Sequence, residues 1–201
     1  VLLFIISILI SFLILKNKGL TSLNNTVLIT AAFYLFSTTL KDFFSERFIN
    51  YSQRVSHFGF SLLILSILFN SIFSSEIITN IKVGENFSYK GGTIKLDSIE
   101  NKKINNYESI IGNFRLIDNN NNLTILKPEL RIYNTPNTST SEADIKTTLF
   151  YDKFLVMNLV KGNEYFNIRY QVKYFMIWIW ISTLLLALGG TLSVFRRVNE
   201  K

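Results

Sequence analysis

Hydrophobic and polar residues divide the chain into apolar runs near its two ends and a middle stretch in which the two kinds alternate. Four runs contain no Lys, Arg, Asp or Glu, and they are Val1–Leu15, Leu20–Leu40, Val55–Phe73 and Tyr174–Phe195. A helix needs about 20 apolar residues to cross a bilayer, and the last two runs have 19 and 22. The second run is polar in its first third, and the first lacks the basic segment and cleavage site of a signal peptide. We therefore predict an integral membrane α-helical protein with about four transmembrane helices, at 1–15, 20–40, 55–73 and 174–195, the first of them cut short at its start.

Basic residues flank these runs unevenly, which predicts an orientation. Six lie on one side, in the loop 41–54 and in the tail: Lys41, Arg47, Arg54, Arg196, Arg197 and Lys201. Two lie on the other side, Lys16 and Lys18. Because cytoplasmic loops carry the excess of Lys and Arg, we predict that the loop 41–54 and the tail are cytoplasmic. Trp178 and Trp180 then lie at the outer end of the last helix, where an aromatic belt is expected.

The stretch 76–173 predicts an extracytoplasmic β-rich domain of about 100 residues between the third and fourth helices. Its segments mix β-branched and polar residues in partial alternation: Ile77–Val83, Thr93–Ile99, Tyr107–Ile117, Leu123–Lys127, Glu129–Tyr133, Asp152–Val160 and Glu164–Val172. The tripeptide Lys161-Gly162-Asn163 predicts a tight hairpin between the last two. The segment Ser139–Leu149 is instead compatible with a short helix, with Ser141 as its cap near Asp144. The predicted organisation is three helices over 1–75, a small barrel or sandwich over 76–173, and a last helix with a basic tail over 174–201.

Composition supports a membrane protein and excludes several kinds of chemistry. The 201 residues are 48% hydrophobic and 17% charged, whereas soluble proteins have about 25% charged residues. With no cysteine and one histidine, the chain cannot form a disulfide, a thiolate nucleophile or a multi-histidine zinc site. Stretch 76–173 is nearly neutral, with 13 basic and 11 acidic residues, so no basic stripe for nucleic acid is expected. Nucleotide-binding and hydrolase motifs are absent, and no catalytic residue is predicted. The chain begins with Val inside an apolar run, so we expect it to be a piece of a longer protein.

His57 is the residue most indicative of function, because it lies near the inner end of the third apolar run. An ionisable side chain inside a membrane span is costly unless it has a partner. A neutral imidazole commonly binds metals and is a frequent axial ligand of haem iron. The residues on its helix face are Gln53, Arg54, Phe60, Ser61 and Ile64, among which Arg54 is a candidate contact for a haem propionate. The alternative is a histidine that hydrogen-bonds to a neighbouring helix. Gly189-Gly190 is typical of close helix packing.

A series of motifs runs through nearly all of residues 45–197. It begins with RVSHFGFSLLILSI and continues through ITNIKVGENFSYKGGTIKLDSIE and NYESIIGNFRL. It extends through LKPELRIYNTPNTSTSEADIKTTLFYDKFLVMNLV to WIWISTLLLALGGTLSVFRR. In their order and spacing, these motifs resemble the C-terminal third of the CcmF family of cytochrome c-type biogenesis proteins.

The resemblance implies part of a haem lyase, which attaches haem covalently to apocytochrome c. It implies that His57 is one axial ligand of a membrane-embedded haem b, since Ser56-His57-Phe58-Gly59 matches the context of the family's second haem b histidine. The first of those histidines and the tryptophan-rich segment that receives a second haem are not in this sequence, so the fragment alone is not expected to be catalytic. Implied partners are the haem chaperone CcmE, apocytochrome c and thiol-reducing subunits of the CcmH/CcmI type. The implied location is the bacterial or mitochondrial inner membrane.

Two other classes of protein remain compatible with the residue pattern. A β-domain tethered between helices is also typical of a transporter subunit of the FtsX/MacB type, or of a sensor whose outer domain binds a partner. A structural assembly factor is the third possibility. In these alternatives His57 has no ligand role, so haem binding distinguishes them from a haem lyase.

Overall fold

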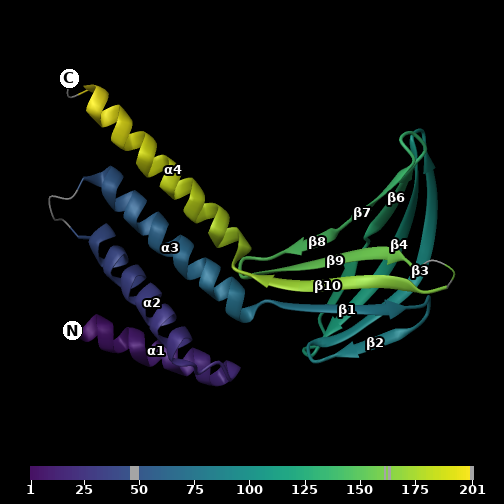
Figure 1. Cartoon of the computed structure of the whole chain (residues 1–201), viewed down its shortest axis with the longest axis horizontal. Coiled ribbons are helices and arrows are strands. Elements are labelled where there is room, and N and C mark those ends of the chain that lie inside the picture. The colour runs from purple at the N-terminus through teal and green to yellow at the C-terminus, as the bar shows by residue number, and fades with distance from the viewer. Residues whose placement is uncertain (46–49, 161, 163, 200–201) are drawn as a thin grey trace. The chain divides into compact units, whose positions relative to one another are not determined.

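A computed structural model describes residues 1–45, 50–160, 162 and 164–199 of the chain (Figure 1). The chain forms two compact units. The first, here called the helical unit, comprises Val1–Ser74 and Tyr174–Lys201, and the second, the β-unit, comprises Ser75–Lys173. The chain therefore enters the β-unit after its third helix and leaves it just before its fourth.

The helical unit contains four helices in its described part, α1 (Leu2–Lys18), α2 (Leu23–Phe43), α3 (Tyr51–Phe73) and α4 (Met176–Asn199). Each helix packs on its neighbour in chain order, so α3 lies between α2 and α4 (Figure 1). Local sequence sets the first connection. Gly19 ends α1 in the left-handed conformation, and the Ser22 hydroxyl caps α2 by accepting the Asn25 N–H.

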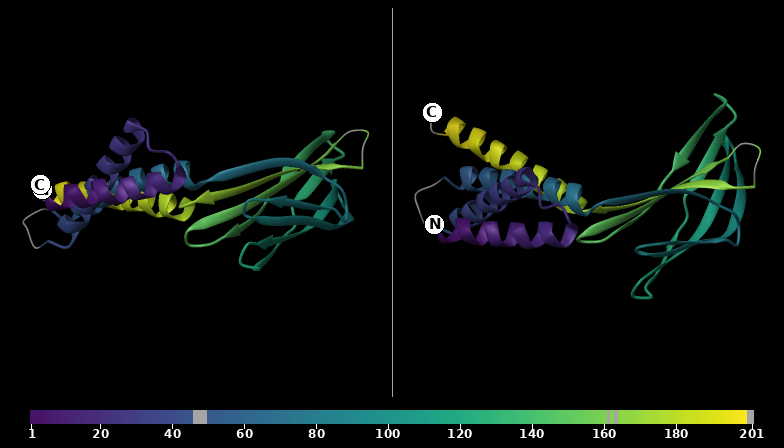
Figure 2. Two further views of the ribbon diagram at one scale, coloured as in Figure 1. Left: turned by 90° about the horizontal axis from the view of Figure 1, so that it is seen from below. Right: turned by 60° about the horizontal axis from the view of Figure 1, so that its bottom comes forward.

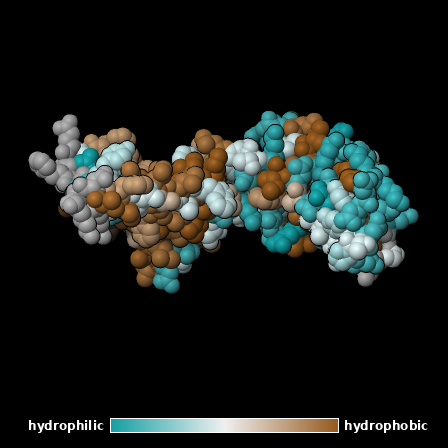
Figure 3. Space-filling model, turned by 90° about the horizontal axis from the view of Figure 1, so that it is seen from above, coloured by the Kyte–Doolittle hydropathy of each residue, from teal (hydrophilic) through white to brown (hydrophobic). Residues whose placement is uncertain are grey.

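Within the described residues, two helices are long and apolar enough to cross a membrane, Tyr51–Phe73 and Met176–Arg196. The sequence predicts four. Of the other two helices, α1 has 17 residues, and α2 contains Asn24 and Asn25 at one end and Lys41 and Asp42 at the other. Figure 3 shows that apolar side chains cover most of the visible surface of the helical unit, whereas the β-unit presents mainly hydrophilic ones.

The β-unit is a sandwich of two sheets (Figure 2). The first sheet has the order β1-β10-β9-β8, with bounds β1 Ser75–Ile81, β8 Asp144–Thr147, β9 Tyr151–Leu159 and β10 Phe166–Tyr174. The second has the order β2-β3-β4-β6-β7, with bounds β2 Asn86–Tyr89, β3 Gly92–Ile104, β4 Tyr107–Asp118, β6 Glu129–Tyr133 and β7 Thr138–Glu142. Strand β5 (Leu123–Leu126) pairs with β4. This architecture confirms the predicted β-rich domain.

Alternate residues of both sheets point inward and form one core. Its fully buried members come from six strands and include Ile81, Ile94, Leu96, Phe114, Leu155, Met157 and Ile168. Removing this apolar area from water is the main force that holds the two sheets together. The core sits wholly within the β-unit, so the unit has its own source of stability.

The predicted helix at Ser139–Leu149 is wrong, because the segment forms β7 and β8. Strand β7 pairs antiparallel with β6, and the carboxylate of Asp144 accepts the backbone N–H of Lys127 at 2.6 Å. Strand pairing satisfies backbone N–H and C=O groups that would otherwise bond within a helix, and the hydrogen bond from Lys127 occupies the Asp144 carboxylate. In the predicted hairpin, Lys161 and Asn163 lie outside the described residues. Gly162 between them has a φ of 79°, and the Val160 N–H donates to the Tyr165 carbonyl at 3.3 Å.

Candidate functional site

The site is built where α3 and α4 approach each other at two glycines. A methyl group on Gly59 would lie 3.0 Å from Leu185 Cβ and 3.1 Å from Leu186 N. One on Gly189 would lie 2.7 Å from the backbone N of Ser56. Such distances leave no room for a side chain, and small residues are what permit close backbone approach in membrane helices. Of the two glycines predicted to pack, Gly189 does so, whereas Gly190 has no atom within 4 Å of its missing Cβ.

Polar contacts fix α3 against its other neighbours. The hydroxyls of Ser61 and Thr39 lie 2.6 Å apart and join α3 to α2 in a fully buried position. At the other end of α3, the Asn70 amide donates to the Tyr174 carbonyl at 2.6 Å, just before α4 begins. Each hydrogen bond made away from water restricts how far the helix can rotate or slide. These contacts therefore fix which face of α3 meets α2 and which meets α4.

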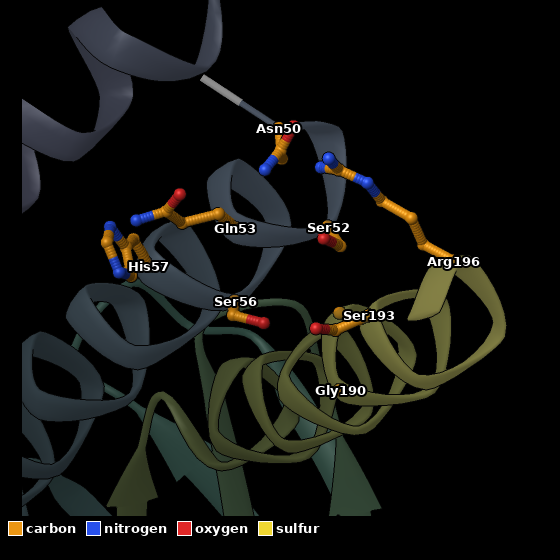
Figure 4. Close-up of a pocket in the computed structure, with 9 residues that line it drawn as sticks. Asn50, Ser52, Gln53, Ser56, His57, Gly190, Ser193 and Arg196 are labelled. Carbon is orange, nitrogen blue, oxygen red and sulfur yellow. The ribbon is translucent and has the colours of Figure 1, made fainter. Parts of the chain in front are cut away.

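A groove of about 510 Å³ opens beside the glycine contact (Figure 4). It is lined by Asn50, Ser52, Gln53, Ser56, His57, Gly189, Gly190, Ser193 and Arg196. The lining is polar although the helices that form it are apolar. Figure 4 shows Ser56 and Ser193 pointing toward each other across the groove, with His57 and Gln53 on one side and Arg196 reaching from α4 on the other. The groove thus contains an imidazole and a guanidinium from different helices.

His57 lies on a face of α3 that neither α2 nor α4 covers. Its side chain is exposed, as are those of Gln53 and Phe60 on the same face. Two residues that helical spacing had assigned to this face lie elsewhere. Ser61 is buried against α2, and Arg54 is half-buried and does not line the groove. Among the described residues no group of three His, Cys, Asp or Glu side chains could hold a metal, so His57 does not belong to a cluster of metal-ligating side chains there.

Sequence reasoning missed Arg196 as a member of the site. The sequence marks Arg196 only as a basic residue of the predicted cytoplasmic tail. Its place in the same groove as His57 follows from the packing of α4 on α3, which brings together residues 139 positions apart in the sequence. The sequence signal that pointed to it was indirect, because the Gly189-Gly190 pair marks where α4 meets a neighbouring helix.

The β-unit carries its charges on outward faces, mostly in pairs. Glu129 and Arg131 on β6 bind each other, with Arg131 Nε 3.0 Å from Glu129 Oε2 and the guanidinium 5.2 Å from the Tyr107 ring centroid. The hydrogen bond from Arg131 to Glu129 raises the pKa of the guanidinium. These side chains thus bind one another on the outer surface of the second sheet.

A second cross-strand pair joins the two strands of the β-unit that connect to helices. Arg169 Nε on β10 lies 2.6 Å from Glu76 Oε1 on β1, and the Gln171 amide donates to Glu76 Oε2 at 2.8 Å. The hydrogen bonds from Arg169 and then from Gln171 lower the pKa of Glu76. The charged form of Glu76 is thus favoured by the pairing of β1 with β10.

Comparisons with known proteins agree on one family. The model of the CcmF C-terminal beta-sandwich matches residues 72–174, just over half of the chain. The cytochrome c-type biogenesis protein ccl1 of Rhodobacter capsulatus is 34% identical over 122 residues, which is 61% of this chain and 19% of that protein. The cytochrome c-type biogenesis protein CcmF of Pseudomonas fluorescens is 25% identical over 147 residues, 73% of this chain and 22% of that protein.

A solved structure shares the fold. The chain matches the structure of cytochrome c heme lyase CcmF with a TM-score of 0.68 and 18% identity, covering 94% of this chain and 33% of that one. The chain therefore spans between about a fifth and a third of the length of the proteins it matches.

Proposed function

Because this chain belongs to the CcmF family of cytochrome c-type biogenesis proteins, we propose that it is the C-terminal part of a membrane haem lyase subunit. That enzyme joins haem to apocytochrome c through bonds to two thiols of the apoprotein. The observation that carries the proposal is that the single histidine of the chain is one of the residues lining a polar groove formed by two membrane-type helices. Membership of this family favours a haem lyase subunit over a transporter subunit, a sensor or an assembly factor.

The role proposed for His57 is that of an axial ligand to a b-type haem. The imidazole of His57 lies on an uncovered helix face, which leaves room for a large planar group, and the groove beside it supplies polar contacts. When bound, a b-type haem would supply one-electron transfer, which would keep the iron of a delivered haem reduced. The chain has no second histidine, so the other axial ligand would come from outside these 201 residues. His57 would hold the group in place and set its electronic environment, and no residue of this chain is proposed to be catalytic.

Two arginines are candidates for contact with haem propionates. Arg54 lies one helical turn before His57 and is half-buried. Arg196 lines the same groove as His57, which favours it as the stronger contact. A guanidinium suits a carboxylate because its N–H groups form a planar fork. Because Arg196 lines the groove, Arg196→Gln should lower haem retention more than Arg54→Gln does.

We propose that all four helices span the membrane, with the loop 41–54 and the tail cytoplasmic and the β-unit outside. Helices α1 and α2 support this through exposed apolar side chains, such as Leu9, Leu13, Val27 and Leu28, that lipid would cover. The uneven distribution of basic residues supports the orientation. The location would be the bacterial inner membrane or its mitochondrial equivalent.

Three kinds of partner fit this function. CcmE would deliver haem, apocytochrome c would receive it, and CcmH/CcmI-type subunits would keep the cysteine thiols reduced. The hydrophilic surface of the β-unit is the part of this chain that we propose for docking them (Figure 3). Pull-down of each partner by the assembled protein, with and without the β-unit, would test these contacts one at a time.

The decisive experiment is a reduced-minus-oxidised absorption spectrum of the assembled protein, with the wild type measured beside His57→Ala. A b-type signal in the wild type that is lost in the variant, and partly restored by free imidazole, is expected of a ligand. Thr183→Ala is the matched control, since Thr183 is an exposed polar residue of α4 that does not line the groove. A wild-type protein without a haem signal, when its partners are present and its fold is intact, would contradict the proposal.

A further inference from the structure

The turn between β8 and β9 presents two large apolar side chains at its apex. Leu149 is 52% exposed and Phe150 is 54% exposed. Thr148 closes the turn beneath them. Its N–H donates to the Tyr151 carbonyl at 3.0 Å, its hydroxyl donates to the same carbonyl at 2.6 Å, and that hydroxyl accepts the Tyr151 N–H at 3.1 Å. These hydrogen bonds therefore fix the backbone on both sides of the two half-exposed residues.

Large apolar residues are unusual at such a position. Turns favour Gly, Asn, Asp, Ser or Pro, which satisfy the backbone and tolerate water. A single exposed apolar residue needs no explanation, but two adjacent ones that are each about half exposed on a turn form an apolar surface that a further apolar environment can cover. The other tight turns of the β-unit follow the ordinary rule. Gly84 serves the turn after β1, and the Asp118–Asn122 segment serves the turn after β4.

Sheet topology places this apex at the end of the β-unit where the chain connects to the membrane helices. Strands β9 and β10 are neighbours, and the Val160 N–H bonds to the Tyr165 carbonyl at the far end of the pair. The start of β9 and the end of β10 consequently lie at the same end of the sheet. Ser75 at the start of β1 pairs with Val172 near the end of β10, so it lies at that end too. Helix α3 ends at Phe73 and α4 begins at Met176, so both continue from there.

The residues next to the apex have the composition of a membrane interface. Lys146 and Lys153 pair directly across β8 and β9. The Lys153 ammonium lies 5.8 Å from the Tyr151 ring centroid, and Lys173 lies 5.3 Å from that of Phe154. Asp152, next to Lys153 on β9, is buried. Tyrosine is enriched at the headgroup level, and lysines near it are attracted to anionic lipids.

We propose that the Leu149–Phe150 apex inserts into the lipid interface and gives the β-unit an attachment to the membrane besides its two helix connections. The partner is the bilayer, because the apex lies at the end of the sheet that continues into α3 and α4. Insertion would limit how far the β-unit can tilt about those two connections. The inference rests on the proposed membrane location of α3 and α4, but not on haem binding.

The absence of cysteine from the sequence allows a direct test, since one introduced cysteine can be labelled alone. Phe150→Cys would carry an environment-sensitive fluorophore in the full chain, reconstituted into vesicles of phosphatidylcholine and phosphatidylglycerol that contain spin-labelled lipids. Val83→Cys is the matched control, because Val83 is also apolar and 52% exposed but follows the opposite end of β1. Ile67→Cys, at an exposed position of α3, reports whether the helix is in the bilayer.

Several-fold stronger quenching by the lipid label at position 150 than at position 83 is expected, with position 67 also quenched. Equal quenching at 150 and 83, with 67 quenched, overturns apex insertion while leaving the membrane location of α3 intact. A label at 150 that is shielded from iodide yet not quenched by lipid would mean that a protein covers the apex, which also overturns the proposal. Failure to quench position 67 removes the premise and the proposal together. If Phe150→Cys does not fold, Leu149→Cys provides the same readout.

Discussion

The two units of this protein differ in the side chains that they leave on the surface. In the helical unit Ser11, Ser61 and Ser182 are fully buried beside apolar residues such as Leu15, whereas Leu184 and Leu188 are 65% and 56% exposed. In the β-unit Leu96 and Phe114 are fully buried, and charged pairs such as Arg115 with Asp97 lie on the outside. The helical unit thus buries small polar residues and exposes large apolar ones to a degree that the β-unit does not.

The difference teaches that each unit is folded against its own solvent. In water, burial of apolar area drives folding, so Leu and Phe go inside. In lipid, apolar side chains gain nothing by leaving the surface, and close packing between helices decides which residues are buried. Serine suits that role because it is small and its hydroxyl can bond to its own helix. Ser11 Oγ donates to the Ser7 carbonyl at 2.6 Å, and Ser7 Oγ donates to the Leu3 carbonyl at 2.8 Å.

The largest expected effect is in the core of the β-unit. Phe114→Ala removes a fully buried ring and should destabilise the sandwich by about 3–5 kcal/mol. Hydrogen exchange of the β3 and β4 amides, measured in the full chain, reports this local stability. Leu123→Ala, on neighbouring β5 with the leucine 56% exposed, is the control and should change stability by at most about 0.5 kcal/mol. Similar losses of stability in both variants would contradict a core that is stabilised by the burial of apolar residues away from water.

The next effect compares exposed apolar residues in the two units. Leu184→Lys places a charge on a surface of α4 that we assign to lipid, and should disfavour membrane insertion by about 2.5–3.5 kcal/mol at the helix centre. Ile125→Lys places the same charge on an exposed strand position and should have almost no effect, because water is already there. Insertion efficiency of α4 in a translocon assay measures the first, and thermal unfolding of the β-unit measures the second. If lysine at position 184 leaves the insertion of α4 unchanged, the assignment of this surface of α4 to lipid is wrong.

A smaller effect separates two adjacent glycines. Gly189→Ala forces a methyl group against the backbone of α3 and should weaken packing of α3 on α4 by about 1–3 kcal/mol. Gly190→Ala meets no atom within 4 Å, so the helix pair should be as stable as in the wild type. Resistance of the helical unit to denaturation in detergent ranks the two. The reverse ranking would mean that α4 is rotated relative to the packing described above.

The smallest effect concerns the pH dependence of the β-unit. The pKa of Glu76 lies below the ordinary value because of Arg169 and Gln171, so folding favours its charged form. Its contribution to stability is present above the unfolded pKa and is lost as the pH falls through the folded pKa, below the ordinary 4.5. The wild type should therefore be more stable than Glu76→Gln near pH 7, and the two should converge on acidification. Denaturant unfolding at several pH values measures the difference.

Glu164→Gln is the control for this pH experiment. Its side chain is 89% exposed, and its carboxylate lies 3.4 Å from the Lys82 ammonium. Exposed pairs of this kind contribute little to stability. A convergence as large for Glu164→Gln as for Glu76→Gln would show that the cross-strand pair has no special role.

Sequence patterns predicted most strands and the two strongest membrane helices, because each follows from a period that local residues repeat. They failed at Ser139–Leu149, where a plausible helix cap was overridden by the pairing of β7 with β6. Helical spacing placed Ser61 on the same face as His57, but contact with Thr39 turns that residue toward α2. The hydrophobic period of a segment describes that helix or strand alone, whereas the elements packed against it decide which of its faces is buried.

The sequence by itself determined that the chain combines membrane-type helices with a β-rich domain, and that His57 is its single imidazole. Composition and periodicity suffice for these features because they depend on the solvent that each segment prefers. Only the tertiary structure decided that Arg196 shares a groove with His57 and that Gly189, rather than Gly190, contacts α3. It also decided which end of the sandwich carries Leu149 and Phe150. These features join residues far apart in the chain, so they depend on helix packing and strand order, which no local pattern encodes.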